Sequence, residues 1–106
     1  MKFLAILSAV ALFSVSAMAE IAFKNGDKVA FLGDSITYLG AAYPSGYCKL
    51  VDKALEWQGI KCEMIYAGIS GHKSNQMLER LDRDVLSHKP QWMLLSCGVN
   101  DVWHGE

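Results

Sequence analysis

The 106-residue sequence has no excess of charge of either sign, no internal repeat and no low-complexity segment. Ten lysines and arginines stand against eleven aspartates and glutamates, so there is no basic stripe to attract a nucleic acid or an anionic lipid surface. The absence of linkers and repeats limits the chain to one globular unit. We therefore expect no nucleic acid and no membrane surface among its partners.

The sequence has one long apolar run, Phe3 to Phe13. This run is too short to span a bilayer. It follows Lys2 and leads to the small-residue pattern Ala17-Met-Ala19, as in a secretory signal peptide. The alternative is a buried N-terminal helix, but that would show polar positions at helical spacing, and the run offers only Ser8. We expect residues 1–19 to be a signal peptide and the protein to be secreted or periplasmic. No cysteine follows the predicted cleavage site, so we expect no stable membrane anchor after cleavage.

Cysteine is limited to three residues, Cys48, Cys62 and Cys97. An odd number in an exported protein leaves at least one cysteine without an intramolecular partner. Cys62 and Cys97 each border an apolar strand, so we interpret both as buried small hydrophobic residues.

The sequence from residue 20 onward alternates between strand and helix patterns. Apolar runs predict strands over 28–32, 61–66 and 92–96, and helical periodicity predicts helices over 46–58 and from 75 to about 87. Ser45 and Ser74 are candidate helix caps, and residues 38–44 read as a connection. This order predicts an α/β fold with right-handed crossovers and a parallel sheet.

Each predicted helix has one apolar stripe and one charged face. We expect the two stripes to be buried; they consist of Tyr47, Leu50, Val51, Ala54 and Leu55, and of Met77, Leu78, Leu81 and Val85. The charged residues of the second helix are expected to be solvated; they are Glu79, Arg80, Asp82, Arg83 and Asp84.

The first predicted strand ends in Gly33 and Asp34 and then presents Ser35 at the turn into the next segment. Functional groups collect at the carboxyl ends of parallel strands, where helix N-terminal N–H groups are close. Gly33 can take backbone angles closed to other residues, and Asp34 is a common turn former. Ser35 is therefore a candidate nucleophile, although Gly-Asp-Ser is also an ordinary turn tripeptide.

The other two predicted strands also finish in glycine-bearing polar loops, which carry Gly71 and Asn100. An ester hydrolase needs N–H donors aimed at the oxyanion that forms during attack. The backbone N–H groups of Ser35 and Gly71 and the carboxamide of Asn100 could supply them from one rim of the sheet. Read singly, Gly71 could be a simple turn glycine and Asn100 a turn or cap residue.

These motifs resemble the conserved blocks of the SGNH hydrolases, also called the GDSL esterase/lipase family. Gly33 to Thr37 is similar to the first block, Ala67-Gly-Ile-Ser-Gly71 to the second and Gly98-Val-Asn-Asp101 to the third. The second block usually opens with an asparagine, where this chain has Tyr66. The resemblance implies a three-layer α/β/α fold with a flavodoxin-like parallel sheet.

The resemblance also assigns roles to residues. It implies that Ser35 is the nucleophile, that Ser35, Gly71 and Asn100 form the oxyanion hole, and that Gly33, Asp34 and Asp101 support them. The family's fourth block is an Asp-x-x-His pair on a separate, later loop. Asp101-Val-Trp-His104 has that spacing but directly continues the third block, so we do not interpret it as the pair. We expect the pair to be absent here, and residues 20–106 to be the N-terminal part of an SGNH domain.

The remaining histidines are expected to have no catalytic role. His72 and His104 are predicted to be solvated loop residues on the rim, with contact to substrate as the alternative, and His88 is predicted to lie at the end of an exposed helix.

Together these observations predict a secreted serine esterase with no metal or organic cofactor. Export and the rim residue Trp103 favour acetyl esters of carbohydrates as substrates, small or polymeric. Three alternatives stay open: a lysophospholipase or thioesterase that hydrolyses lipid esters, a non-catalytic carbohydrate-binding module, and an inactive truncated product.

Overall fold

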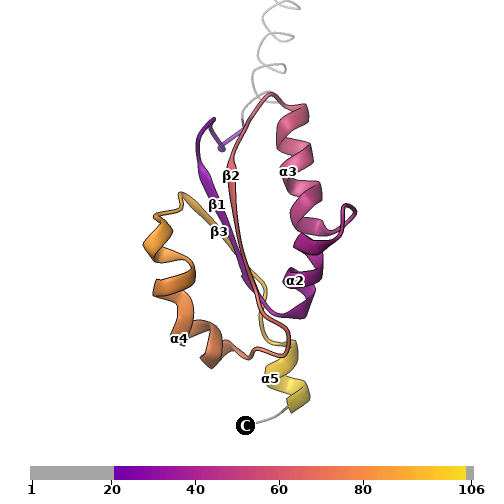
Figure 1. The fold of residues 1–106 in the computed structure, drawn as a ribbon, viewed down its shortest axis with the longest axis vertical. Coiled ribbons are helices and arrows are strands. Elements are labelled where there is room, and N and C mark those ends of the chain that lie inside the picture. Colours follow the sequence, from indigo (N-terminus) through magenta and orange to yellow (C-terminus); the bar gives the residue numbers. More distant parts are fainter. Residues whose placement is uncertain (1–20, 105–106) are drawn as a thin grey trace, which may run out of the picture.

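The computed structural model describes residues 21–104, in which a three-stranded parallel sheet is covered by helices on both faces (Figure 1). The strands are β1 (Lys28–Gly33), β2 (Glu63–Gly68) and β3 (Trp92–Leu95), in the order β2-β1-β3. This arrangement confirms the predicted α/β class and the start of a flavodoxin-like strand order. The predicted signal peptide lies outside the described residues.

The central strand β1 is buried on both faces of the sheet, as its continuous apolar run predicts. Its side chains alternate between two clusters, because successive residues of a strand point to opposite faces. Val29 and Phe31 pack on one face with Cys48, Leu55 and Cys62. Ala30 and Leu32 pack on the other face with Ala67, Met77 and Val85.

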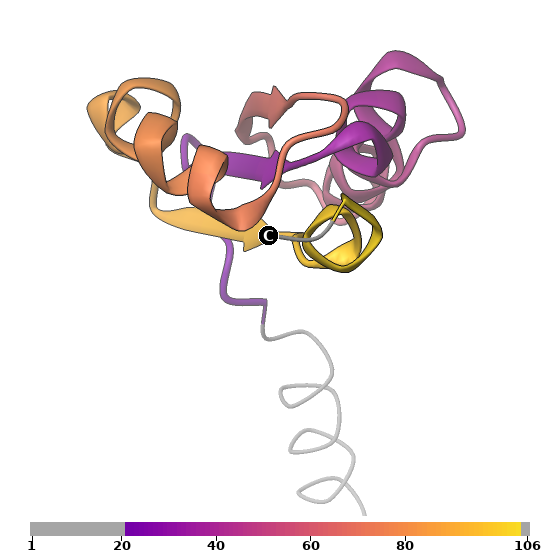
Figure 2. The same ribbon diagram turned by 90° about the horizontal axis from the view of Figure 1, so that it is seen from below.

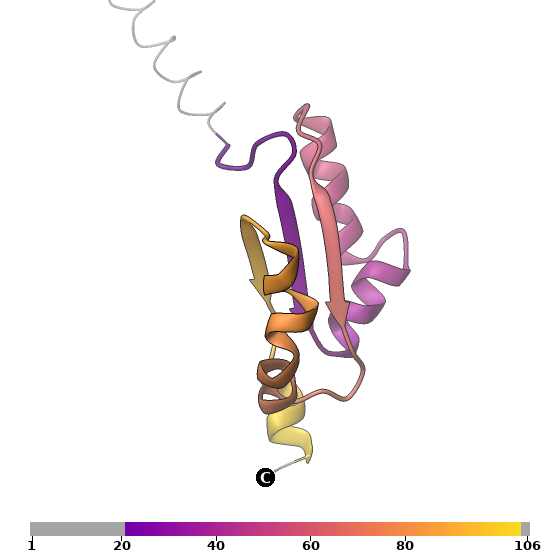
Figure 3. The same ribbon diagram turned by 60° about the vertical axis from the view of Figure 1, so that its left-hand side comes forward.

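Helices α2 (Ser35–Ala42) and α3 (Tyr47–Trp57) cover the first of these faces. The second face carries α4 (Ser74–Asp84), which is followed by the short 3-10 helix η1 (Leu86–His88). Figure 2 shows the two layers on either side of the sheet. The last helix, α5 (Val99–His104), lies beyond the carboxyl ends of the strands, at the edge where all three arrowheads point in Figure 3.

Helix α2 replaces the connection predicted over residues 38–44. It packs closely on α3, since a Cβ added to the buried Gly40 would lie 2.7 Å from the Tyr47 ring. The contact with α3 therefore stabilises this short helix, and the helix propensity of residues 35–42 does not reveal such a contact. At the start of α3 the N-cap is Gly46, not the predicted Ser45, and no side chain caps the helix. Helix α4 begins at Ser74 itself, with Lys73 as its N-cap.

The predicted buried stripes are only partly correct. Leu55, Met77 and Val85 are buried, but Leu50 is 55% exposed and Leu78 is 71% exposed. Ala54 is also exposed. The prediction of a buried Cys97 is wrong too, because this residue follows the end of β3 and is exposed.

An apolar groove lies beside β3, which is an edge strand within the described residues. It is lined by residues of α4 and β3 and by Leu32 of β1; the residues from α4 and β3 include Leu78, Leu81, Met93 and Leu95. Among residues 21–104, no helix has the length and apolar character needed to cross a membrane.

Candidate active site

Ser35 is the first residue of α2 and directly follows the end of β1. The first helical hydrogen bond runs from the Tyr38 N–H to the Asp34 carbonyl, at 2.9 Å, so the Ser35 N–H is one of the amides that the helix leaves without an internal acceptor. Ser35 is partly exposed. Its hydroxyl and its amide therefore lie together at the positive end of a helix.

Asp34 and Gly33 hold this turn in place, each by a different means. The buried carboxylate of Asp34 caps α2 by accepting a 2.9 Å hydrogen bond from the Ile36 N–H. Gly33 lies in β1 with no left-handed backbone angle, so the expectation that it supplies unusual backbone angles is wrong. Its requirement is space, because an added Cβ would lie 2.1 Å from the Thr37 Oγ1.

Gly71 lies in the loop between β2 and α4 with a φ of +81°. This angle favours glycine, and apart from Gly71 itself and its two chain neighbours no described atom lies within 4 Å of the position that a Cβ would occupy. The surroundings of Gly71 are thus open on the side where a side chain would otherwise stand. Its backbone can be approached closely there by a bound molecule.

The three strand ends are joined to one another by backbone hydrogen bonds. The Ile69 N–H donates to the Gly33 carbonyl at 3.1 Å, and the Ser96 N–H donates to the Leu32 carbonyl at 3.0 Å. The loops that carry Ser35, Gly71 and Asn100 therefore leave the sheet side by side.

Asn100 and Asp101 tie α5 to the loop before α4. Asn100 lies in the first turn of α5 and donates from Nδ2 to the His72 carbonyl at 3.1 Å, which leaves the second N–H of this carboxamide available. The Asp101 carboxylate accepts a 2.6 Å hydrogen bond from the Ser74 hydroxyl. This hydrogen bond is the main reason that the pKa of Asp101 is lowered.

None of the histidines of the described segment hydrogen-bonds to Ser35. His104 is exposed on α5, and the Asp101 carboxylate that precedes it is bound to Ser74. His72 is partly buried and its Nδ1 accepts a 3.0 Å hydrogen bond from the Arg80 Nε, so the prediction of a solvated His72 is wrong. His88 is exposed in η1.

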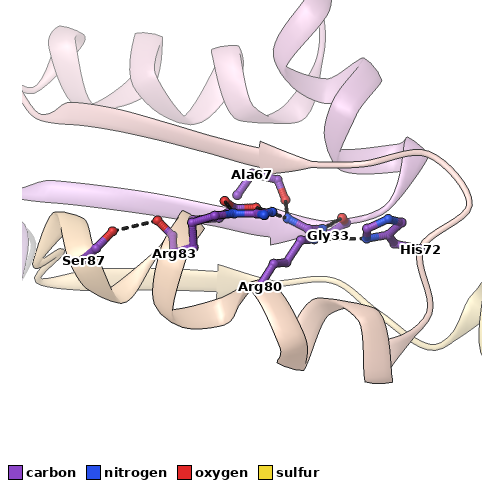
Figure 4. A network of polar contacts seen from close by, with 7 residues as sticks. Gly33, Ala67, His72, Arg80, Arg83 and Ser87 are labelled. Atoms are coloured by element: carbon purple, nitrogen blue, oxygen red, sulfur yellow. Dashed lines mark hydrogen bonds and ion pairs between the residues drawn. The ribbon is translucent and has the colours of Figure 1, made fainter.

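The prediction of a solvated Arg80 is also wrong. The side chain of Arg80 is only 4% exposed and points to the ends of β1 and β2 (Figure 4). The signal that could have found it is its spacing, because Arg80 follows the buried Met77 at i+3 and shares its face of α4.

The buried cysteines offer no competing nucleophile. Cys48 packs below α2, where its Sγ donates to the Thr37 carbonyl at 3.8 Å. Burial is the main cause that raises the pKa of the Cys48 thiol, and burial raises the pKa of Cys62 as well. Both thiols are therefore protonated at neutral pH and poor nucleophiles. In the part of the chain that the structure describes, no group of three or more His, Cys, Asp or Glu side chains could hold a metal ion.

Residues 31–106 match the GDSL-like lipase/acylhydrolase family. An acetylxylan esterase of Geobacillus stearothermophilus is 33% identical over 91 residues, which cover 74% of this chain and 42% of that protein. The thioesterase 1/protease 1/lysophospholipase L1 of Escherichia coli K12 is 37% identical over 81 residues, which cover 74% of this chain and 37% of that protein.

The solved structures similar to this chain include the acetyl xylan esterase AlAXEase, with a TM-score of 0.66 and 44% identity. The match covers 73% of this chain and 39% of AlAXEase. This chain thus spans less than half the length of the relatives that it matches. Because the family match takes in most of the chain and the parallel sheet has the same arrangement, the chain belongs to the GDSL-like lipase/acylhydrolase family.

Proposed function

We propose that this chain carries the nucleophile and the oxyanion donors of an esterase that removes acetyl groups from carbohydrates. The observation that carries the proposal is the position of Ser35 at the start of α2, beside the loop of Gly71 and the helix of Asn100. Membership of a family of ester hydrolases supports the reaction class. The two acetylxylan esterases among its relatives support the acetyl ester as substrate.

In the proposed mechanism the Ser35 Oγ attacks the ester carbonyl carbon while a general base takes its proton. The Ser35 N–H, the Gly71 N–H and the unused N–H of Asn100 then stabilise the negative charge on the carbonyl oxygen. Collapse of this intermediate expels the alcohol, which takes the proton from the base, and water releases the acetyl group from Ser35. The base is expected on a separate Asp-x-x-His loop of the complete enzyme.

The decisive experiment compares Ser35→Ala with Ser45→Ala in the enzyme produced from its natural coding sequence. Ser45 is exposed in the connection between α2 and α3, so its substitution is a matched control. We expect Ser35→Ala to abolish hydrolysis of a chromogenic acetyl ester with the fold intact, and Ser45→Ala to hydrolyse it normally. Equal activity of the two variants would refute the role of Ser35. A wild type with no esterase activity would favour a binding module or an inactive product.

The acyl group separates the two candidate esterase functions. Similarity to the Escherichia coli thioesterase and lysophospholipase favours lipid esters as the second candidate. An acetylated xylooligosaccharide should be hydrolysed far faster than a long-chain acyl ester if the first proposal is correct, and the reverse ratio would select the second. Trp103 is 80% exposed on α5 and could stack on a sugar ring. Its replacement by alanine should then raise KM for the acetylated sugar but not for a small acetyl ester.

We further propose that the protein is exported and begins at Glu20 after cleavage behind Ala19. The intact mass of protein recovered from the periplasm or the medium tests this directly. Exported protein that retains residues 1–19 would contradict the proposal.

A further inference from the structure

We propose that Arg80 is a positioning residue, whose guanidinium holds the strand end before Ser35 and the loop of Gly71 in one fixed relative position. This inference rests on the proposed function, in which Ser35 and the Gly71 N–H act on the same substrate. Arg80 itself would touch no substrate.

The side chain of Arg80 is buried and almost fully hydrogen-bonded. It is 4% exposed, and a buried guanidinium is tolerated only when its N–H groups have acceptors. Arg80 makes four hydrogen bonds, so one of its five N–H groups is left over. Pairing of four of the five N–H groups fixes the orientation of the guanidinium in the protein.

Three of these acceptors belong to the segments that flank the candidate site (Figure 4). Nη2 donates to the Gly33 carbonyl at 2.8 Å, and Nη1 donates to the Ala67 carbonyl at 2.9 Å. Nε donates to His72 Nδ1 at 3.0 Å. One rigid planar group thus contacts the end of β1, the end of β2 and the residue that follows Gly71.

Anchoring of α4 alone does not explain this arrangement. The ion pair between Arg80 and Asp84, at 3.3 Å, is shared with Arg83, which is exposed and lies 2.7 Å from the same carboxylate. Met77 and Val85 already bury the helix face against the sheet. What Arg80 adds is a set of donors in fixed directions, a property that lysine lacks.

Loss of these donors is expected to affect turnover more than binding. A displacement of about 1 Å between reacting groups can cost about 100-fold in rate. Because Arg80 has no contact with substrate in this proposal, KM should change little. A merely structural role would lower the amount of folded enzyme and leave kcat per folded molecule unchanged.

The test uses Arg80→Met and Arg80→Lys, with Arg83→Met as the matched control on the same helix, all in the enzyme made from its natural coding sequence. We expect Arg80→Met to lower kcat about 100-fold on a chromogenic acetyl ester with KM within about threefold. Arg80→Lys should recover part of this loss, and Arg83→Met should equal wild type. Wild-type kcat in folded Arg80→Met would overturn the proposal. If Arg80→Met does not fold, a wild-type kcat in Arg80→Lys would overturn the proposal.

A second measurement does not depend on activity. The Ile69 N–H donates to the Gly33 carbonyl, and the unprotonated Nδ1 of His72 has a distinct nitrogen chemical shift. We expect Arg80→Met to speed hydrogen exchange at Ile69 and to shift His72 Nδ1, and Arg83→Met to do neither. If wild type hydrolyses no ester, the proposed function fails. The role of Arg80 is then tested only by hydrogen exchange at Ile69 and by the chemical shift of His72 Nδ1. Unchanged signals in folded Arg80→Met would overturn it.

Discussion

Ser74 donates to the Asp101 carboxylate from both its hydroxyl and its backbone N–H, so a side chain of α5 caps the first turn of α4. The hydroxyl hydrogen bond is 2.6 Å long, and the N–H lies 3.2 Å and 3.1 Å from the two oxygens. A carboxylate at this place also interacts favourably with the positive end of the helix. The link between α4 and α5 is therefore charge-dependent.

Asp101→Asn should remove the pH dependence of this link. Because the pKa of folded Asp101 is lowered, its contribution to stability is present above the unfolded pKa of about 3.9 and is lost as the pH falls through the lower folded value. We expect wild type to have a higher Tm than Asp101→Asn at pH 6, and this difference to shrink as the pH falls below about 3.9. Asp27, whose pKa is also lowered, is present in both proteins and cancels in the comparison. A Tm difference that stays constant from pH 6 to pH 3 would contradict the prediction.

Asn100→Ala should lower the turnover of the complete enzyme about 10²–10³-fold, the usual effect of removing one oxyanion donor. Asn75→Ala is the matched control, because Asn75 is exposed near the start of α4. Turnover on a chromogenic acetyl ester checks the prediction. Near-normal turnover would mean that Asn100 only holds the His72 carbonyl.

Gly33→Ala should destabilise the fold more than Gly26→Ala. At Gly33 a Cβ would meet the Thr37 Oγ1 at 2.1 Å, whereas at Gly26 it would meet nothing within 4 Å and cost only the strain of a φ of +87°. We expect the free energy of unfolding to fall by about 3 kcal/mol or more in Gly33→Ala, which is at the upper end for overpacking. In Gly26→Ala we expect it to fall by about 1 kcal/mol. Urea unfolding measures both, and the reverse order would be inconsistent with a tightly packed turn at Ser35.

Residues 20–106, purified alone, should show no saturable esterase activity and should elute as aggregate or melt without cooperativity. Within the described residues β3 is an edge strand, and two of its own residues, Met93 and Leu95, are 44% and 55% exposed. Leu95→Glu should therefore reduce association, whereas Leu50→Glu, at an equally exposed position of α3, should not. Light scattering behind size exclusion checks both variants. A wild-type monomer with a sharp thermal transition and Ser35-dependent hydrolysis would contradict the prediction and direct attention to His104 as base.

The features that the sequence predicts well are those set by local patterns. The apolar run of β1 identifies a central strand, because only a strand covered on both faces can bury Val29, Ala30, Phe31 and Leu32 together. The positions of Ser35, Gly71 and Asn100 at three strand ends follow directly from that reading. Hydrogen bonds from the Ile69 N–H to the Gly33 carbonyl and from Asn100 to the His72 carbonyl join the segments that carry these residues, and their joint role in an oxyanion hole stays a prediction.

The features that the sequence does not predict depend on partners distant in the chain. Helix α2 contains Gly40 in its interior, a residue that opposes helix formation but lets α3 approach closely. Arg80 stands in a run of charged residues that indicates a solvated surface, and only the carbonyls of Gly33 and Ala67 explain its burial. Leu78 is apolar at helical spacing, yet it borders the groove beside the open edge of β3.

The hydrogen bonds of Arg80 also define what can be transplanted. A designer who grafts the Gly71 loop into another parallel sheet would have to move residues 67–84 as one piece. The Arg80 side chain that orients the loop belongs to α4, more than one helix turn after the loop ends. The receiving sheet would need a free carbonyl at the end of its central strand, in the place of Gly33. A Gly71 loop transferred without α4 would keep its sequence but would lose the hydrogen bonds from Arg80 that fix its position.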